Sequence, residues 1–136
     1  MDVFVYGTLT DPDRATAVLG ADGFGDRGSA RLYGLRRVDG RYPTLAPGGH
    51  ADGRLLRTER IEVLDRYEGV AAGLYARLSV PVDGNGDGNG SRAAVYVGDP
   101  ERLDAAEPFE RPDEGSFVER VERYVRENRV AVERLD

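Results

Sequence analysis

The sequence predicts one α+β domain, a small mixed, partly closed β-barrel with flanking helices. Several short segments rich in β-branched and aromatic residues are bounded by glycine and proline, as strands are. Three segments with helical periodicity lie among them without strict alternation, which is typical of an α+β domain. The 136 residues contain no internal repeat and no linker, so 1–136 is expected to fold as a single domain.

Local signals predict each element in turn. Proline and acidic residues mark a helix start at 10–13, and Ser116 and Glu119 have capping-box spacing. Strict alternation marks the strand over 74–82, with Tyr75 on the face opposite its apolar residues. The expected elements, in order, are a strand over 2–6, a helix over 10–19, a loop over 21–28, a strand over 29–38, an irregular segment over 41–49, a strand over 50–57, a helix over 58–67, strands over 74–82 and 92–98 joined by a hairpin loop over 83–91, a loop over 99–115, a helix over 116–128, and from Val130 a last strand or a frayed tail.

One glutamate in the second predicted helix breaks two local rules. The helix is expected to begin with Thr58 as its N-cap and to end before Gly69. Ile61, Leu64 and Glu68 then share one apolar face, so Glu68 should point toward the core. Glu68 also stands at the negative end of the helix dipole. Burial and the dipole both disfavour the charged carboxylate, so both raise the pKa of Glu68. Such a residue indicates a functional site, with a glutamate reaching water at a frayed helix end as the alternative.

A second candidate site is the loop formed by Tyr6, Gly7, Thr8 and Leu9. It joins a buried strand to the start of a helix, where free N–H groups and the positive end of the dipole bind anions. Gly7 allows a ligand to approach the backbone closely. A carboxylate could therefore be held there without a lysine. The alternative is an ordinary strand-to-helix turn.

Composition excludes several classes of function. Acidic residues number 25 against 19 basic ones, all arginine, which gives a net charge of -6 and a pI near 4.9, so nucleic acid is not an expected partner. Without cysteine and with one histidine, neither a thiolate nor a multi-histidine metal site is available, and no metal is predicted. The sequence lacks a signal peptide and a long apolar segment, so a soluble cytoplasmic protein without a membrane partner is expected.

Two glycine-rich patterns are interpreted as loops. Residues 23–28 match the dinucleotide-binding pattern, but they follow a helix where that motif requires a strand. Residues 83–88 match the start of a calcium-binding loop, but Ala94 stands where a bidentate acid is needed.

Three short motifs stand in a specific order. Tyr-Gly-Thr-Leu follows the first strand, Leu-Asp-x-x-Glu-Gly contains Glu68, and Gly-x-Tyr ends at Tyr75, seven residues further on. Over Val3 to about Tyr96 the sequence resembles the gamma-glutamylcyclotransferase-like family, which includes gamma-glutamylaminecyclotransferase. Serine often stands in the family where this sequence has Thr8. Further agreements are Tyr42, Pro43, Gly53, Arg77 and Tyr96.

The resemblance implies an enzyme that forms 5-oxoproline by attack of the substrate's own α-amine on its γ-carbonyl. It implies Glu68 as the catalytic acid-base and Tyr75 as a pocket residue. The backbone of the loop would bind the gamma-glutamyl group, with no cofactor or metal required. The residues implied in that binding are Tyr6, Gly7, Thr8 and Leu9.

Two alternatives to this interpretation stay open. One is a cyclotransferase specific for gamma-glutamylamines, and the other is a non-catalytic small-ligand-binding module on the same fold. The departing group would be selected by loops, which we expect over 39–49 and 99–115.

The lysine-free, acidic composition is similar to that of proteins from salt-rich cytoplasm. Because the Debye length falls from ~10 Å at 0.1 M salt to ~3 Å at 1 M, self-repulsion at a net charge of -6 should weaken with salt. We expect a higher melting temperature in molar potassium chloride than at low salt, measured by thermal unfolding. An unchanged or lower value would instead favour a GC-rich genome as the origin of the arginine bias.

Overall fold

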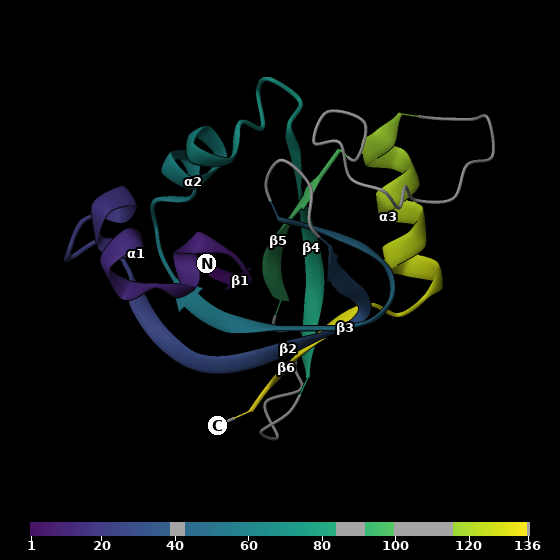
Figure 1. Ribbon diagram of the computed structural model, residues 1–136, viewed down its shortest axis with the longest axis horizontal. Coiled ribbons are helices and arrows are strands. Elements are labelled where there is room, and N and C mark those ends of the chain that lie inside the picture. Colours follow the sequence, from purple (N-terminus) through teal and green to yellow (C-terminus); the bar gives the residue numbers. More distant parts are fainter. Residues whose placement is uncertain (39–42, 84–91, 100–115, 136) are drawn as a thin grey trace.

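In the computed structural model, the described residues are 1–38, 43–83, 92–99 and 116–135, and they form a six-stranded barrel with three α-helices (Figure 1). Residues 39–42, 84–91 and 100–115, which make up most of the expected loops over 83–91 and 99–115 and all but the first residue of the calcium-like pattern, lie outside the described residues. The elements are β1 (Asp2–Val5), the 3₁₀ turn η1 (Thr8–Thr10), α1 (Pro12–Leu19), β2 (Gly25–Val38), β3 (Thr44–Arg57), α2 (Ile61–Glu68), β4 (Tyr75–Asp83), β5 (Arg92–Gly98), α3 (Phe117–Glu127) and β6 (Ala131–Arg134).

The barrel is fully closed, where the sequence predicted a partly closed one. Its strand order is β1-β3-β2-β6-β4-β5, and β5 returns to pair with β1. Val3 in β1 lies opposite Leu56 of β3 on one side and opposite Ala94 of β5 on the other. The β1/β5 and β4/β6 pairs are parallel and the remaining pairs antiparallel, so the sheet is mixed as expected. Closure removes the free sheet edges at which strands of other chains could add.

Strands β2 and β3 are longer than predicted, because glycine and proline were interpreted as strand breakers. Strand β2 begins at Gly25, inside the expected loop over 21–28, and β3 begins at Thr44, inside the expected irregular segment. Pairing register shifts between Tyr33 and Leu35, next to Pro47 on the facing strand. Bulges are positions where a sheet tolerates proline and glycine, so these residues bend the long hairpin without ending it.

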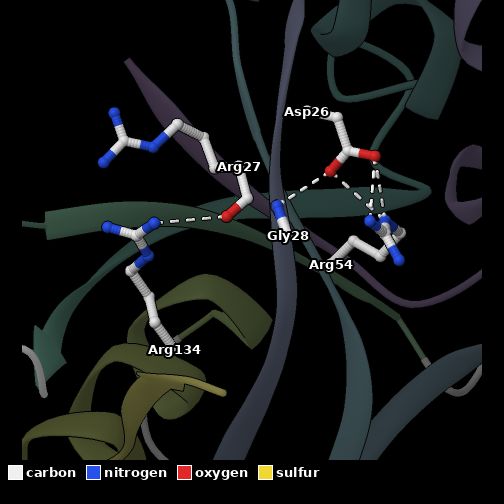
Figure 2. Close-up of polar contacts among 5 residues, drawn as sticks. All are labelled: Asp26, Arg27, Gly28, Arg54 and Arg134. Carbon is white, nitrogen blue, oxygen red and sulfur yellow. Dashed lines mark hydrogen bonds and ion pairs between the residues drawn. The ribbon is translucent and has the colours of Figure 1, made fainter. Parts of the chain in front are cut away.

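A second irregularity in β2, between Asp26 and Ser29, is held by polar contacts (Figure 2). The carboxylate of Asp26 accepts from the N–H of Gly28 at 2.8 Å and from Nη2 of Arg54 at 2.9 Å. The backbone hydrogen bond from Gly28, followed by Arg54, lowers the pKa of Asp26. From β6, Arg134 donates to the carbonyl of Arg27 at 3.4 Å. The contacts tie the bulged strand to its neighbours on both sides.

Two apolar clusters stabilise the fold. One fills the barrel interior, with Phe4 and Leu32 fully enclosed, and α3 covers it with Val121. The other lies between the outer face of β1 and β5 and the helices α1 and α2, where Leu19 and Leu64 are buried. Helices α1 and α2 therefore lie on one side of the barrel and α3 on another (Figure 1). No helix among the described residues is long and apolar enough to cross a membrane.

The helix ends correct one prediction and confirm two. Arg60, not Thr58, is the N-cap of α2; the Thr58 hydroxyl accepts from the N–H of Arg60 at 3.0 Å and donates to Gly23, which stabilises the turn before the helix. Gly69 ends α2 in the left-handed region with φ 73°, as expected. The capping box at Ser116 is present. The tail after Val130 forms a strand, β6, which pairs with β2 and β4.

Gly53 permits the close approach of β1 and β3. An added Cβ there would lie 2.0 Å from the Val5 carbonyl oxygen, whereas one at Gly25 would meet nothing within 4 Å. We expect Gly53→Ala to lower the free energy of unfolding by roughly 1–3 kcal/mol, because the backbone of β1 must move. The control Gly25→Ala should change it by less than about 0.5 kcal/mol. Equal denaturation midpoints for the two variants would contradict this explanation.

Candidate active site

All six residues predicted for the site line one cavity of about 450 Å³. The cavity opens where β1 ends, beside α1 and α2. Its buried walls come from the barrel, from Tyr6 after β1 and from Leu9 of η1, and its exposed rim comes from Thr8 of η1 and from α1 and α2. The six predicted residues are Tyr6, Gly7, Thr8, Leu9, Glu68 and Tyr75.

The loop after β1 differs in one respect from the prediction. It does not lead directly into α1, because η1 intervenes and the first N–H groups of α1 are already capped by Asp11, which accepts from Asp13 at 2.9 Å. The carbonyl of Gly7 accepts from the N–H and hydroxyl of Thr10, which shapes the turn. The backbone N–H groups of Thr8 and Leu9 have no acceptor among the described residues. These N–H groups, and not the dipole of α1, are the candidate anion-binding groups of the loop.

Glu68 is the last residue of α2 and lines the cavity. Leu64 is fully buried and Ile61 partly buried on the same face, which confirms the predicted orientation of the helix. The helix end is not frayed, since the N–H groups of Gly69 and Val70 bond back to the last turn. Burial raises the pKa of Glu68 to about 7. Its carboxyl has no hydrogen-bond or ion-pair partner among the described residues, so it is able to exchange a proton with a molecule in the cavity.

The last turn of α2 is held against the barrel by Asp65. Its carboxylate accepts from the hydroxyl of Tyr96 in β5 at 2.7 Å and pairs with Arg77 in β4 at 3.1 Å. The Tyr6 hydroxyl donates to the backbone carbonyl of Tyr96. Burial, more than the neighbouring Tyr75 and Glu68, raises the pKa of Tyr6 well above its usual value. Because Asp65 lies one turn before Glu68, these contacts fix the position of the glutamate relative to the loop.

Tyr75 lines the cavity, but its hydroxyl contacts the protein. It donates to the carbonyl of Pro43 at 2.6 Å and so braces the segment that enters β3. Strand alternation correctly placed Tyr75 opposite Leu78 and Val80. That opposite face is nevertheless buried at Tyr75, because the cluster under α1 and α2 covers it. Tyr42, the neighbour of Pro43, lies outside the described residues.

Two further residues at the rim, Arg14 and Tyr67, were not predicted from the sequence. The Tyr67 hydroxyl lies 2.9 Å from the hydroxyl of Thr8 and links α2 to the loop across the rim. Arg14 is exposed in the first turn of α1 and lines the same cavity. A cation near the positive end of a helix is unfavourable, so the signal that singled out Glu68 at the negative end of α2 could also have found Arg14.

Comparison with known proteins gives the family. Residues 3–119 match the model of the family described as gamma-glutamyl cyclotransferase, AIG2-like, so the chain belongs to that family. The sequence matches no protein of curated function.

Solved structures share the fold. A structure titled gamma-glutamyl cyclotransferase is 18% identical, with a TM-score of 0.60 over 71% of this chain; the chain spans 65%, less than two thirds, of that protein. The Arabidopsis thaliana protein At5g39720.1 is 27% identical, with a TM-score of 0.57 over 93% of this chain and 83% of that one. The uncharacterized Homo sapiens protein loc79017 is 16% identical, with a TM-score of 0.59 over 90% and 97% of the two chains.

The raised pKa of Glu68 predicts that the difference in stability between the wild type and a Glu68→Gln variant depends on pH. Its pKa of about 7 in the folded protein lies above the ordinary 4.5, so the folded state holds the proton more tightly between these values. The glutamate therefore lowers the free energy of unfolding as pH rises from about 4.5 to 7, by roughly 3 kcal/mol in total. We expect the free energy of unfolding of Glu68→Gln, measured by urea unfolding, to equal that of the wild type near pH 4. At pH 8 it should be higher than that of the wild type by this amount.

The control for this measurement is Glu62→Gln, on the exposed side of the same helix. That carboxylate lies in the first turn, where negative charge is favourable, so its removal should not stabilise the protein at any pH. A Glu68→Gln variant that is destabilised at pH 8 would show that the carboxylate has a structural role.

Proposed function

We propose that this protein is a gamma-glutamyl cyclotransferase-type enzyme that releases 5-oxoproline from a gamma-glutamyl amide or peptide. The observation that carries the proposal is the Glu68 carboxyl, which faces the cavity without a partner among the described residues and has a pKa of about 7. A carboxyl near neutrality can both accept and donate a proton at physiological pH. Membership of the family supports the reaction class.

In this mechanism Glu68 accepts a proton from the substrate's α-ammonium group. The freed amine attacks the γ-carbonyl carbon, so a C–N bond forms and closes the five-membered lactam. The amide C–N bond then breaks as Glu68 returns the proton to the departing nitrogen. The ring nitrogen loses a second proton, which the released amine takes up, so the products are a neutral lactam group and an ammonium ion. Atoms balance without water: one gamma-glutamyl amide gives one 5-oxoproline and one amine.

The loop and the cavity walls orient the substrate. The N–H groups of Thr8 and Leu9 are available to bind the α-carboxylate or the oxyanion that develops on the γ-carbonyl. Because the nucleophile and the electrophile belong to one molecule, holding them in a closed conformation supplies much of the rate increase. The buried walls formed by Tyr6, Leu9 and Tyr75 limit the space in which the glutamyl chain can extend.

Replacement of Glu68 tests the mechanism. Glu68→Gln keeps the shape of the side chain but cannot transfer a proton, so we expect 5-oxoproline formation to fall by about 10²–10⁴-fold. Product release is measured by chromatography of 5-oxoproline from gamma-glutamyl peptides. Binding of 5-oxoproline, measured by calorimetry, should persist, because the loop supplies it. Glu62→Gln is the control and should retain activity.

Two other outcomes would replace the proposal. If the wild type binds 5-oxoproline but forms none from any gamma-glutamyl substrate, the protein is a binding module on this fold. If Glu68→Gln keeps near-wild-type turnover, the proton is transferred by another group. A wild type that turns over gamma-glutamylamines alone would identify the amine-specific form of the enzyme.

A further inference from the structure

We propose that Arg14 determines specificity by binding a carboxylate on the departing group, so that the preferred substrates are gamma-glutamyl amino acids and peptides. The inference deepens the proposed function and rests on it. Among the described residues that line the cavity, Arg14 and Glu68 are the charged ones, and they belong to the neighbouring helices α1 and α2 (Figure 1).

The burial of the lining residues indicates which end of the substrate meets Arg14. The walls at Tyr6, Leu9 and Tyr75 are buried, whereas Thr8, Arg14 and Tyr67 are exposed at the rim. Ring closure requires the glutamyl part to fold beside Glu68 and the loop, with its α-amine against the γ-carbonyl. The group attached to the γ-carbonyl nitrogen then points toward the rim. A rim side chain therefore contacts the departing group and not the reacting atoms.

The charge of Arg14 has no structural explanation in α1. Asp11 caps this helix and Asp13 supplies the acid in its first turn, so the positive helix end is already stabilised. A guanidinium in the same turn is unfavourable for the helix. Arg14 forms no hydrogen bond or ion pair with any described residue. A charged residue that its helix disfavours, and that lines a cavity, is available for a ligand.

The chemistry of the ligand follows from the guanidinium. Arginine binds carboxylates with two parallel hydrogen bonds, which gives both affinity and orientation. In this proposal the loop N–H groups bind the carboxylate of the glutamyl part and not the oxyanion, so Arg14 is left for a second carboxylate. A departing amino acid carries one next to its nitrogen, whereas a simple amine carries none. Since the chain has a net charge of -6, a cation at the rim also offsets the repulsion of a substrate that carries two carboxylates.

Three substrates that differ at one group test this inference. They are gamma-glutamyl-alanine, its neutral alaninamide analogue and gamma-glutamyl-ethylamine, which lacks the carboxylate altogether. We expect the wild type to prefer gamma-glutamyl-alanine over both others by about tenfold or more in kcat/KM. Arg14→Gln should cut kcat/KM about 10- to 100-fold for the alanine substrate and leave the other two unchanged. Arg14→Lys should keep part of the preference for the alanine substrate, because lysine retains the positive charge but lacks the paired N–H donors of the guanidinium.

The matched control is Arg66→Gln, an exposed arginine on α2 that does not line the cavity, and it should keep the wild-type preference. The melting temperature of Arg14→Gln should not fall, because the variant removes an unfavourable charge from the helix. An equal fall in the kcat/KM of Arg14→Gln on all three substrates would overturn the inference, since Arg14 would then bind the glutamyl part that the substrates share. Unchanged kinetics on all three, or a general loss with a lower melting temperature, would also overturn it. A wild type inactive on all three would instead overturn the proposed function itself.

Discussion

The pairing of β1 with two neighbours is the constraint on which the rest of the structure depends. β1 lies between β3 and β5, and its four residues close the barrel. The strand ends at Val5, whose carbonyl lies so close to Gly53 that no side chain fits between them. The loop that follows must therefore leave the sheet at one fixed place. That place lies beside the last turn of α2, which Asp65 fastens to β4 and β5.

This arrangement allows two helices to present charges that their own dipoles oppose. Glu68 stands at the negative end of α2, and Arg14 stands in the first turn at the positive end of α1. Neither helix gains stability from these charges. Both side chains instead line one cavity, together with the loop after β1. The stability lost at the two helix ends is offset by the apolar cluster that holds α1 and α2 on the barrel, where Leu19 and Leu64 are buried.

Much of this fold could be predicted from the sequence, because its short-range signals are strong. The alternation in β4, the capping box at Ser116 and the glycine after α2 each specify local structure. The long β2–β3 hairpin was missed in part, because glycine and proline at bulges have the same signature as they have in loops. Full closure of the barrel depends on contacts between β1 and β5, which are about ninety residues apart. Local patterns carry no information on such pairs.

The site was also predictable in part, because local properties of the sequence mark some of its residues and not others. Glu68 could be found because its helix face and helix end are both local properties. The loop was found from its glycine and from a motif, but the 3₁₀ turn that separates it from α1 was not. Arg14 lies six residues after Thr8, and the turn η1 and the start of α1 separate them. Its place at the rim therefore follows from the tertiary fold. Its unfavourable position on α1 was the one local sign.

The pH dependence of 5-oxoproline formation tests the central claim most directly, that the partly buried Glu68, which has no partner among the described residues, is the proton carrier. The measurement is kcat/KM of the wild type for one gamma-glutamyl peptide between pH 5 and 8.5. Because Glu68 must be ionised to accept the proton, kcat/KM should rise with pH and level off through an inflection near pH 7, the pKa set by its burial. A profile that is already level from pH 5.5 upward would show that the essential carboxyl has an ordinary pKa, and would contradict this account of the site.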